Sequence, residues 1–129
     1  MVAARSLYVA FCDDDSWWAP GSLQLAEVAL DAHPQLALVS ARTLVGPRQV
    51  PDPLTASLAS SPLPRSPDAP GPSVFGFLAC SAVLRRRAFC EVGGFNRILF
   101  FMGEEQVLCY DLGGFSRSGT ENRGYCHIC

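Results

Sequence analysis

Three consecutive carboxylates, Asp13, Asp14 and Asp15, are the residues of this sequence best suited to chemistry. They follow the apolar run of residues 6–12, which predicts a strand buried on both faces, as in a parallel sheet. The acids then lie at the carboxyl end of that strand, where open α/β sheets bind ligands. A divalent cation with a preference for oxygen is the simplest compensation for their repulsion. The alternative is a solvated acidic turn that caps the next helix.

A second acidic pair, Glu104-Glu105, precedes a helix predicted over residues 106–112. The positive end of the helix dipole favours carboxylates at this place, so helix capping explains the pair without any chemistry. The chemical alternative is a general base, because a carboxylate within reach of a hydroxyl group can take its proton.

The elements around the first acidic centre follow from the apolar pattern. A helix is predicted from Pro20 to Ala32, since Pro suits a first helical turn and His33-Pro34 ends the pattern. Its broad apolar face predicts packing against a sheet. Residues 36–40 read as a second strand, so residues 6–40 are predicted to form one βαβ unit.

Residues 46–72 hold eight of the ten prolines and are predicted to be a stiff, extended loop. Residues 74–84 are apolar again, and Gly76 within them indicates a bend or a close approach of a ligand.

Arg85-Arg86-Arg87 follows this apolar segment and reads as a solvated helix start, although one of the three could reach a diphosphate. A short helix over residues 86–92 should end at Gly93-Gly94, a signal for a left-handed cap. Residues 113–129 have no apolar period and are expected to be irregular.

The composition fits one packed domain or part of one. The chain has 129 residues, of which 49% are hydrophobic and 17% charged. A net charge of −2 gives no electrostatic case for binding nucleic acid. No run approaches the roughly 20 apolar residues of a membrane span, and the N-terminus does not match a secretory signal. We expect the chain in the cytoplasm or peripheral to the inner face of a membrane.

The six cysteines are expected to be reduced thiols, because four of them lie in apolar segments, where free Cys behaves as a small hydrophobe. Cys126 and Cys129 have a CxxC spacing, but no second pair is present to complete a zinc site.

Taken together, these motifs resemble the family 2 glycosyltransferases of the GT-A fold. Residues 9–23, with Asp13-Asp14-Asp15 and Trp17-Trp18, are similar to the family's DxD strand and the helix after it. Residues 84–96 resemble its stretch ending in Gly-Gly-Phe-Asp, and Gly103-Glu104-Glu105 resembles its acidic catalytic motif. The resemblance covers residues 6–112, with 46–72 as the variable loop.

The resemblance implies an α/β fold: a partial GT-A, Rossmann-like sheet with flanking helices. It also implies inverting transfer of a sugar from a nucleoside diphosphate to a carbohydrate or other hydroxyl acceptor. Asp15 and Asp13 would bind Mn²⁺ or Mg²⁺, and Asp13 or Asp14 would contact the ribose or the metal shell. Trp17 could stack on a sugar face. Glu105, beside Glu104, would be the general base.

The sequence departs from the family at both ends. Residues 1–112 begin at the DxD strand, so the N-terminal half that binds the nucleotide is expected to be missing and the chain alone to have little activity. The tail, residues 113–129, lacks the family's usual ending. Glu105 replaces the usual Asp, which moves the carboxylate by one methylene and leaves it competent as a base.

Two other functions fit the acidic triplet. A phosphatase of the haloacid-dehalogenase type would use Asp13 as nucleophile and Asp15 as acid and base. That family has Thr or Val where Trp17 stands and a downstream Lys, and this chain contains no Lys. The third possibility is a degenerate fragment or binding module without catalysis.

Overall fold

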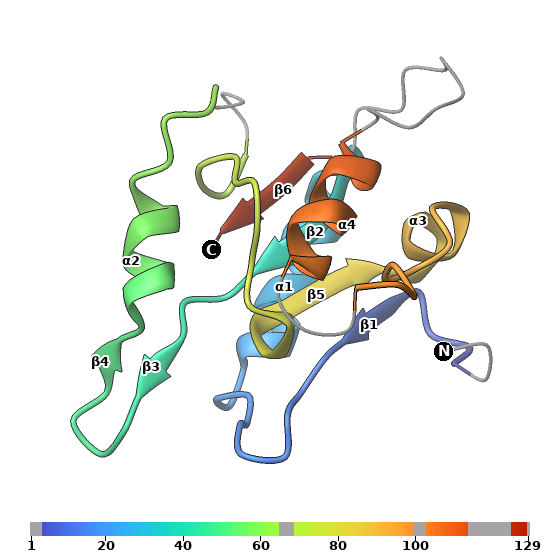
Figure 1. Cartoon of the computed structure of the whole chain (residues 1–129). Coiled ribbons are helices and arrows are strands. Elements are labelled where there is room, and N and C mark those ends of the chain that lie inside the picture. The colour runs from blue at the N-terminus through green and yellow to red at the C-terminus, as the bar shows by residue number, and fades with distance from the viewer. Residues whose placement is uncertain (1–3, 65–68, 100–102, 114–124, 129) are drawn as a thin grey trace.

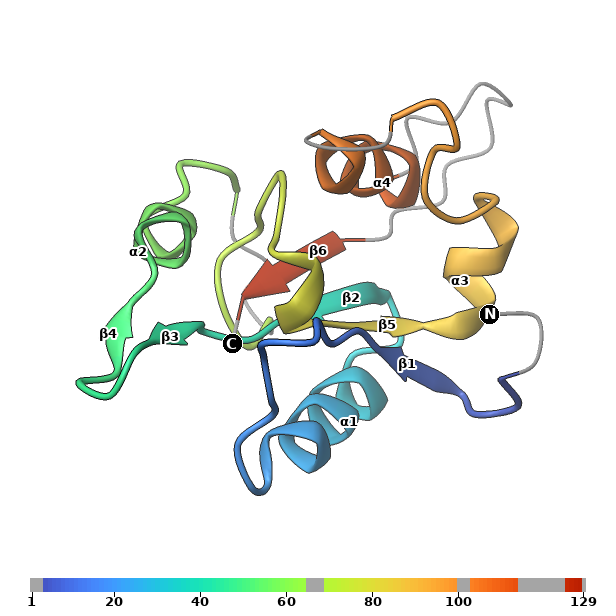
Figure 2. The ribbon, with the colours of Figure 1, turned by 60° about the horizontal axis from the view of Figure 1, so that its bottom comes forward.

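The computed structural model describes residues 4–64, 69–99, 103–113 and 125–128 of the chain. Its centre is a four-stranded sheet with strand order β1-β5-β2-β6, and helices lie on both sides of it (Figures 1 and 2). The strands are β1 (Tyr8–Ala10), β2 (Leu36–Ser40), β5 (Ala82–Arg85) and β6 (Tyr125–Ile128). The chain is therefore mixed α/β, as its apolar pattern predicts.

The first strand differs from its prediction. β1 pairs antiparallel with β5 only, so within the described residues it is an edge strand, and its side chains are half-buried or exposed. The strand buried throughout is β2, which pairs with β5 on one side and with β6 on the other. β1 and β2 do run parallel, as a βαβ unit requires, but the antiparallel β5 lies between them.

The helix α1 (Ser22–Ala32) connects β1 and β2 and covers one face of the sheet (Figure 2). Only Ala26 and Leu30 are buried, whereas Leu25 and Val28 are exposed, so the apolar face is narrower than the sequence predicts. The predicted end of the helix is confirmed, because the His33 N–H donates to the Leu30 carbonyl and the chain then enters β2.

The proline-rich stretch contains regular structure, so the prediction of one extended loop is wrong there. A short hairpin joins β3 (Leu44–Val45) to β4 (Val50–Pro51), and α2 (Pro53–Ala59) follows. Asp52 caps α2 by accepting the Leu54 N–H at 2.8 Å, and Pro53 occupies the first turn, where its missing N–H costs nothing.

Two further α-helices follow β5. They are α3 (Arg86–Glu91) and α4 (Glu104–Leu112), and the latter lies on the opposite side of the sheet from α1 (Figure 2). Residues 125–128 were expected to be irregular, but they form β6, which is parallel to β2. The same expectation for residues 114–124 and 129 lies outside the described residues.

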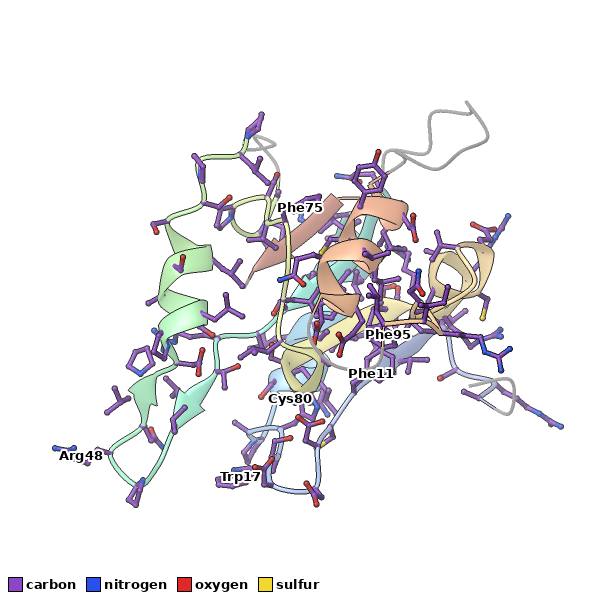
Figure 3. The ribbon with its side chains drawn as sticks, in the orientation of Figure 1. Phe11, Trp17, Arg48, Phe75, Cys80 and Phe95 are labelled. Atoms are coloured by element: carbon purple, nitrogen blue, oxygen red, sulfur yellow. The ribbon has the colours of Figure 1, made fainter. Side chains whose placement is uncertain are left out.

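The end of α3 has the predicted left-handed cap. Gly93 and Gly94 have φ angles of 85° and 79°, and the Gly94 N–H donates to the Phe89 carbonyl. This turn brings Phe95 back against Phe11 and Phe89, with ring centroids 5.3 to 5.7 Å apart (Figure 3). Three aromatic rings therefore hold the end of β1 against α3.

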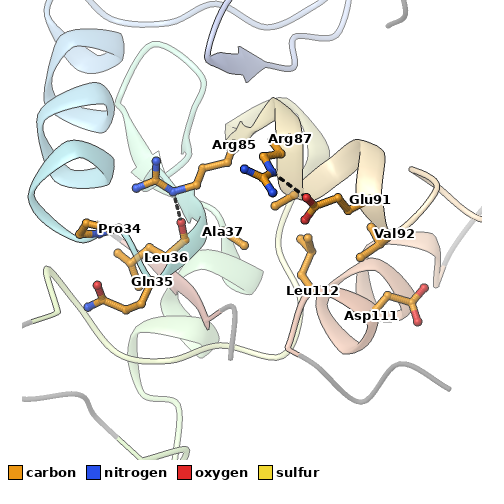
Figure 4. Close-up of a pocket in the computed structure, with 11 residues that line it drawn as sticks. Pro34, Gln35, Leu36, Ala37, Arg85, Arg87, Glu91, Val92, Asp111 and Leu112 are labelled. Atoms are coloured by element: carbon orange, nitrogen blue, oxygen red, sulfur yellow. Dashed lines mark hydrogen bonds and ion pairs between the residues drawn. The ribbon is translucent and has the colours of Figure 1, made fainter. Parts of the chain in front are cut away.

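Arg85 holds together one end of the sheet, where β5 ends and β2 begins. Its guanidinium donates to the carbonyls of Leu36 (2.6 Å), His33 (3.1 Å) and Leu30 (Figure 4). It also lies over the Tyr8 ring, 5.5 Å from the centroid. One side chain thus joins β5 to β1, to the start of β2 and to the last carbonyls of α1, where a positive charge is favourable.

Replacing Arg85 by Lys should therefore unfold the chain at lower denaturant concentration. An ammonium group cannot reach three carbonyls at once, so we expect a loss of about 2–4 kcal/mol in the free energy of unfolding. Urea denaturation followed by circular dichroism measures it. Arg87→Lys is the matched control, because Arg87 is 90% exposed and should change stability by less than about 0.5 kcal/mol. Equal effects of the two substitutions would contradict the role of Arg85.

The two glycines after α3 provide a second test. A Cβ on Gly94 would lie 3.0 Å from the Phe89 ring, whereas a Cβ on Gly93 would meet nothing within 4 Å. Both have positive φ, so Gly93→Ala should cost about 1–2 kcal/mol from backbone strain alone. Gly94→Ala should cost about 1–3 kcal/mol more, because the Phe89 ring must move. Equal losses in thermal denaturation would show that the aromatic contact does not constrain this turn.

Candidate functional site

The three aspartates form a compact turn at the carboxyl end of β1. The Ser16 N–H donates to the Asp13 carbonyl at 3.3 Å, and the Asp13 N–H donates to the Ser16 hydroxyl at 2.9 Å. Asp14 and Asp15 are the two central residues of this turn, and all three aspartates are exposed. The structure therefore places the acids at the end of the strand, as predicted, although that strand is an edge strand.

A short 3-10 helix, η1 (Ala79–Ser81), lies across from the acidic turn. The Phe11 N–H donates to the Ala82 carbonyl at 3.1 Å, which continues the β1–β5 register by one pair and brings Asp13 opposite Cys80. Burial raises the pKa of the Cys80 thiol, and the charge of Asp13 and a hydrogen bond with its carboxylate raise it further. Residue spacing alone does not point to Cys80 as a neighbour of Asp13, and only the strand register identifies it.

The same short helix is anchored to the end of β2. The hydroxyls of Ser40 and Ser81 are buried and 3.0 Å apart, and the Ala41 N–H donates to the Ser81 carbonyl at 2.7 Å. The ends of β1 and β2 are thereby fixed relative to each other, and Cys80 is held between them.

The second acidic group, Glu104-Glu105, interacts electrostatically with the acidic turn. Glu104 and Glu105 begin α4 after Gly103, whose φ is 101°. Burial raises the pKa of Glu105 above its ordinary value, and the negative charges of Glu104 and Asp13 add to the effect, while a hydrogen bond from backbone N–H opposes it. Asp13 and Glu105, far apart in sequence, are therefore close enough to interact electrostatically.

Glu104 is also in an unfavourable environment for a carboxylate. Its Oε2 atom is buried and has no hydrogen-bond partner among the described residues. The residue before α4, Gly103, has no side chain to cap the helix, and the negative charges of the two glutamates are favourable in its first turn. Within the described residues, the ion pair Arg87–Glu91 is the one found, and it involves none of the five acids at this edge.

The two tryptophans have different environments. Trp17 is 85% exposed beside the acidic turn and points into solvent (Figure 3). The Trp18 indole N–H donates to the Phe11 carbonyl at 3.0 Å, and the side chain packs against the core residues between α1 and the sheet. Trp18 is thus part of the scaffold, and Trp17 is available to a ligand.

No three side chains of His, Cys, Asp or Glu in the described parts of the chain are arranged to hold a metal ion. The acidic turn still fits a cation that arrives with a phosphate ligand, because Mg²⁺ typically binds one or two carboxylates, substrate phosphates and water. Asp13 and Asp15 would supply those carboxylates.

The three consecutive arginines, residues 85–87, make their contacts away from the acidic turn. Arg85 is engaged with backbone carbonyls at the other edge of the sheet, and Arg86 donates to the Ser6 carbonyl at 2.9 Å. Arg87 forms the ion pair with Glu91 at 2.7 Å. The suggestion that one of them reaches a diphosphate at the acidic turn therefore has no support in these contacts.

A shallow depression of about 490 Å³ lies beside Arg85, between the start of β2, α3 and the end of α4 (Figure 4). None of the five acids lines it, and Arg85 there already donates to backbone carbonyls. The depression lies at the amino end of β2, whereas the acidic turn lies at the other end of the sheet.

Comparisons with protein-family models, with curated proteins and with solved structures find no match to this chain. Over the described residues, every helix is too short or too polar to cross a membrane.

The contact between the two acidic centres can be tested by titration. Asp13→Asn should lower the pKa of Glu105, because it removes a negative charge that disfavours ionisation of that carboxyl group. Carbon-detected NMR of the Glu105 carboxyl gives the pKa directly. Glu27→Gln, on an exposed position of α1, is the control and should leave the pKa unchanged.

The raised pKa of Glu105 also makes the free energy of unfolding depend on pH. Because folding raises the pKa of Glu105, the folded state binds this proton more tightly, so stability falls as pH rises from the unfolded pKa through the folded one. Glu105→Gln should remove that fall. A pKa of Glu105 that is identical in Asp13→Asn and in the unmodified chain would show that the two centres do not interact.

Proposed function

We propose that this chain acts in inverting glycosyl transfer, from a nucleoside-diphosphate sugar to a hydroxyl acceptor. The observation that carries the proposal is that the charge of Asp13 acts on Glu105 and raises its pKa, after the larger effects of burial and of Glu104. A carboxylate turn suited to a metal-bound diphosphate thus lies within electrostatic range of a carboxyl group whose raised pKa suits a general base. The strands β1 and β2 run in the same direction and are joined by α1, with the acidic turn after β1, and this agrees with a GT-A type of fold, although the antiparallel β5 lies between them.

Each residue then has a distinct role. Glu105 takes the proton of the acceptor hydroxyl while its oxygen attacks the anomeric carbon, and the diphosphate leaves with the electron pair of the broken C–O bond. Asp13 and Asp15 hold Mn²⁺ or Mg²⁺, whose charge would stabilise the leaving diphosphate. Asp14 contacts the ribose, and Trp17 stacks on the sugar.

Glu104 has an electrostatic role in this proposal. Its charge helps to raise the pKa of Glu105, after the larger effect of burial. The location proposed is the cytoplasm or the inner face of a membrane. Cys12, Cys80, Cys90 and Cys109 are free thiols, which agrees with a reducing compartment.

Calorimetric titration of the full chain with ADP, GDP or UDP in the presence of Mn²⁺ tests the acidic turn. Because the half that binds the nucleotide base is expected to be missing, we expect weak, Mn²⁺-dependent binding of at least one nucleotide. Asp15→Asn should weaken it about tenfold to hundredfold, the usual cost of one lost charge-assisted contact. Glu105→Gln should weaken binding less than Asp15→Asn does, and it should lower the release of diphosphate from the matching sugar nucleotide by about 10²-fold or more. Glu27→Gln should behave as the unmodified chain.

Two results would contradict the proposal. One is the same Mn²⁺-dependent affinity in Asp15→Asn as in the unmodified chain, because the turn would then not hold the diphosphate. The other is a phosphorylated Asp13 trapped with a phosphate monoester, which would favour the phosphatase chemistry.

A further inference from the structure

The strand β1 has one edge that no other strand covers among the described residues. It pairs with β5 on one side only and lies at the margin of the sheet (Figure 2). On the β5 side, the Leu7 carbonyl accepts a backbone hydrogen bond and the Phe11 N–H donates one. Because successive residues of an antiparallel strand alternate in the direction of these groups, the backbone N–H and C=O of Tyr8 and Ala10 point away from the sheet.

This edge is accessible from the side of α1. A depression of about 290 Å³ lies between β1 and α1, and Tyr8, Ala10 and Leu23 are among the residues that line it. The Ser6 hydroxyl donates to the Tyr8 carbonyl at 2.6 Å, but a carbonyl oxygen has two lone pairs and can accept a second hydrogen bond. Tyr8 and Ala10 can therefore each donate and accept one backbone hydrogen bond at the free edge.

The residues of β1 are unusual for the edge of a sheet. Natural edge strands are commonly protected by charged side chains, proline or a bulge, which prevent pairing with another chain. Residues 7–11 contain no charged residue and no proline, and the pairing of β1 with β5 is regular. Leu7 is 76% exposed beside this edge. An apolar, unprotected edge of this kind favours an additional strand as its partner.

The edge is complementary to a second copy of itself. In an antiparallel pair with a two-fold axis at Val9, Tyr8 of each copy lies opposite Ala10 of the other, and each donates to and accepts from the residue it faces. The large Tyr8 side chain then stands beside a small methyl group rather than beside a second ring. On the other face of the sheet, Leu7 lies opposite Phe11 of the second copy, which would cover its exposed side chain.

The charges agree with the same arrangement. Arg5 is exposed and precedes β1, whereas the acidic turn follows β1. Because the two strands would run in opposite directions, the Arg5 end of one copy lies toward the acidic turn of the other. A cation thus approaches three exposed carboxylates, Asp13, Asp14 and Asp15, for which the described part of the chain provides no ion pair.

We propose that two copies of the chain associate through their β1 edges and form one continuous sheet. A strand of another polypeptide could make the same backbone hydrogen bonds, but the match of Tyr8 with Ala10 about Val9 favours a second copy. The contact is short, so the dimer is weak, with a dissociation constant between about 10 µM and 1 mM. The association rests on the edge of β1 and is independent of the proposed glycosyl transfer.

Sedimentation velocity of the full chain over this concentration range tests the proposal, and we expect a monomer–dimer equilibrium. Ala10→Pro should weaken the dimer about tenfold to hundredfold, because it removes an outward N–H from each copy and leaves the hydrogen bonds to β5 in place. Leu7→Ser should weaken it about tenfold through the lost apolar contact. Leu25→Ser is the matched control, because Leu25 is 73% exposed on α1, and it should leave the dissociation constant unchanged.

Amide hydrogen exchange, measured by NMR, reports on the edge itself. The N–H groups of Tyr8 and Ala10 gain hydrogen bonds in the dimer, so their exchange should slow as the concentration of the chain rises. The Val9 N–H faces β5 in both states and should depend less on concentration.

Three results would overturn the pairing. The first is a chain that stays monomeric up to about 1 mM, which would leave the edge to a strand of another polypeptide. The second is an equal effect of Leu7→Ser and Leu25→Ser on the dimer. The third is exchange at Tyr8 and Ala10 that does not change with concentration while a dimer forms. If the melting temperature shows that Ala10→Pro does not fold, the two serine variants and the exchange rates decide.

Discussion

The structure depends on the guanidinium group of Arg85. It donates to backbone carbonyls at the end of α1 and at the start of β2, and it extends from the last residue of β5. A carbonyl left without a donor in this half-buried position would cost free energy, and one planar side chain with five donors satisfies several of them. The relative placement of β1, α1 and β2 at this end of the sheet depends on this one group.

The other end of the sheet is held by aromatic packing. Phe11 is the last residue before Cys12 and the acidic turn, and its ring contacts Phe89 and Phe95. Phe95 can reach it only because Gly94 passes close to Phe89 in a conformation that favours glycine. The Gly-Gly-Phe stretch of the sequence therefore acts on the site through the position of β1.

Local signals in the sequence were sufficient for most helices and for the end of each apolar run. The helix ended by His33-Pro34, the left-handed glycines after α3 and the acids at the start of α4 were all predicted from neighbouring residues. The strand pairing was not, because the apolar run of β1 does not show that β5 would pair between it and β2. The α2 helix was missed since the many prolines outweighed the Asp52-Pro53 start signal.

The candidate site shows the same division. The residue types of the acidic turn and of Glu104-Glu105 were evident in the sequence, whereas the electrostatic interaction of Asp13 with Glu105 is a consequence of tertiary packing. Burial and the neighbouring charges of Glu104 and Asp13 favour a proton on Glu105. A cation held by the acidic turn would relieve the same repulsion, so a proton on Glu105 and a cation at Asp13 oppose each other's binding. In the proposed glycosyl transfer this linkage has a direction: a cation at Asp13 would favour the deprotonated Glu105, the form that a general base requires.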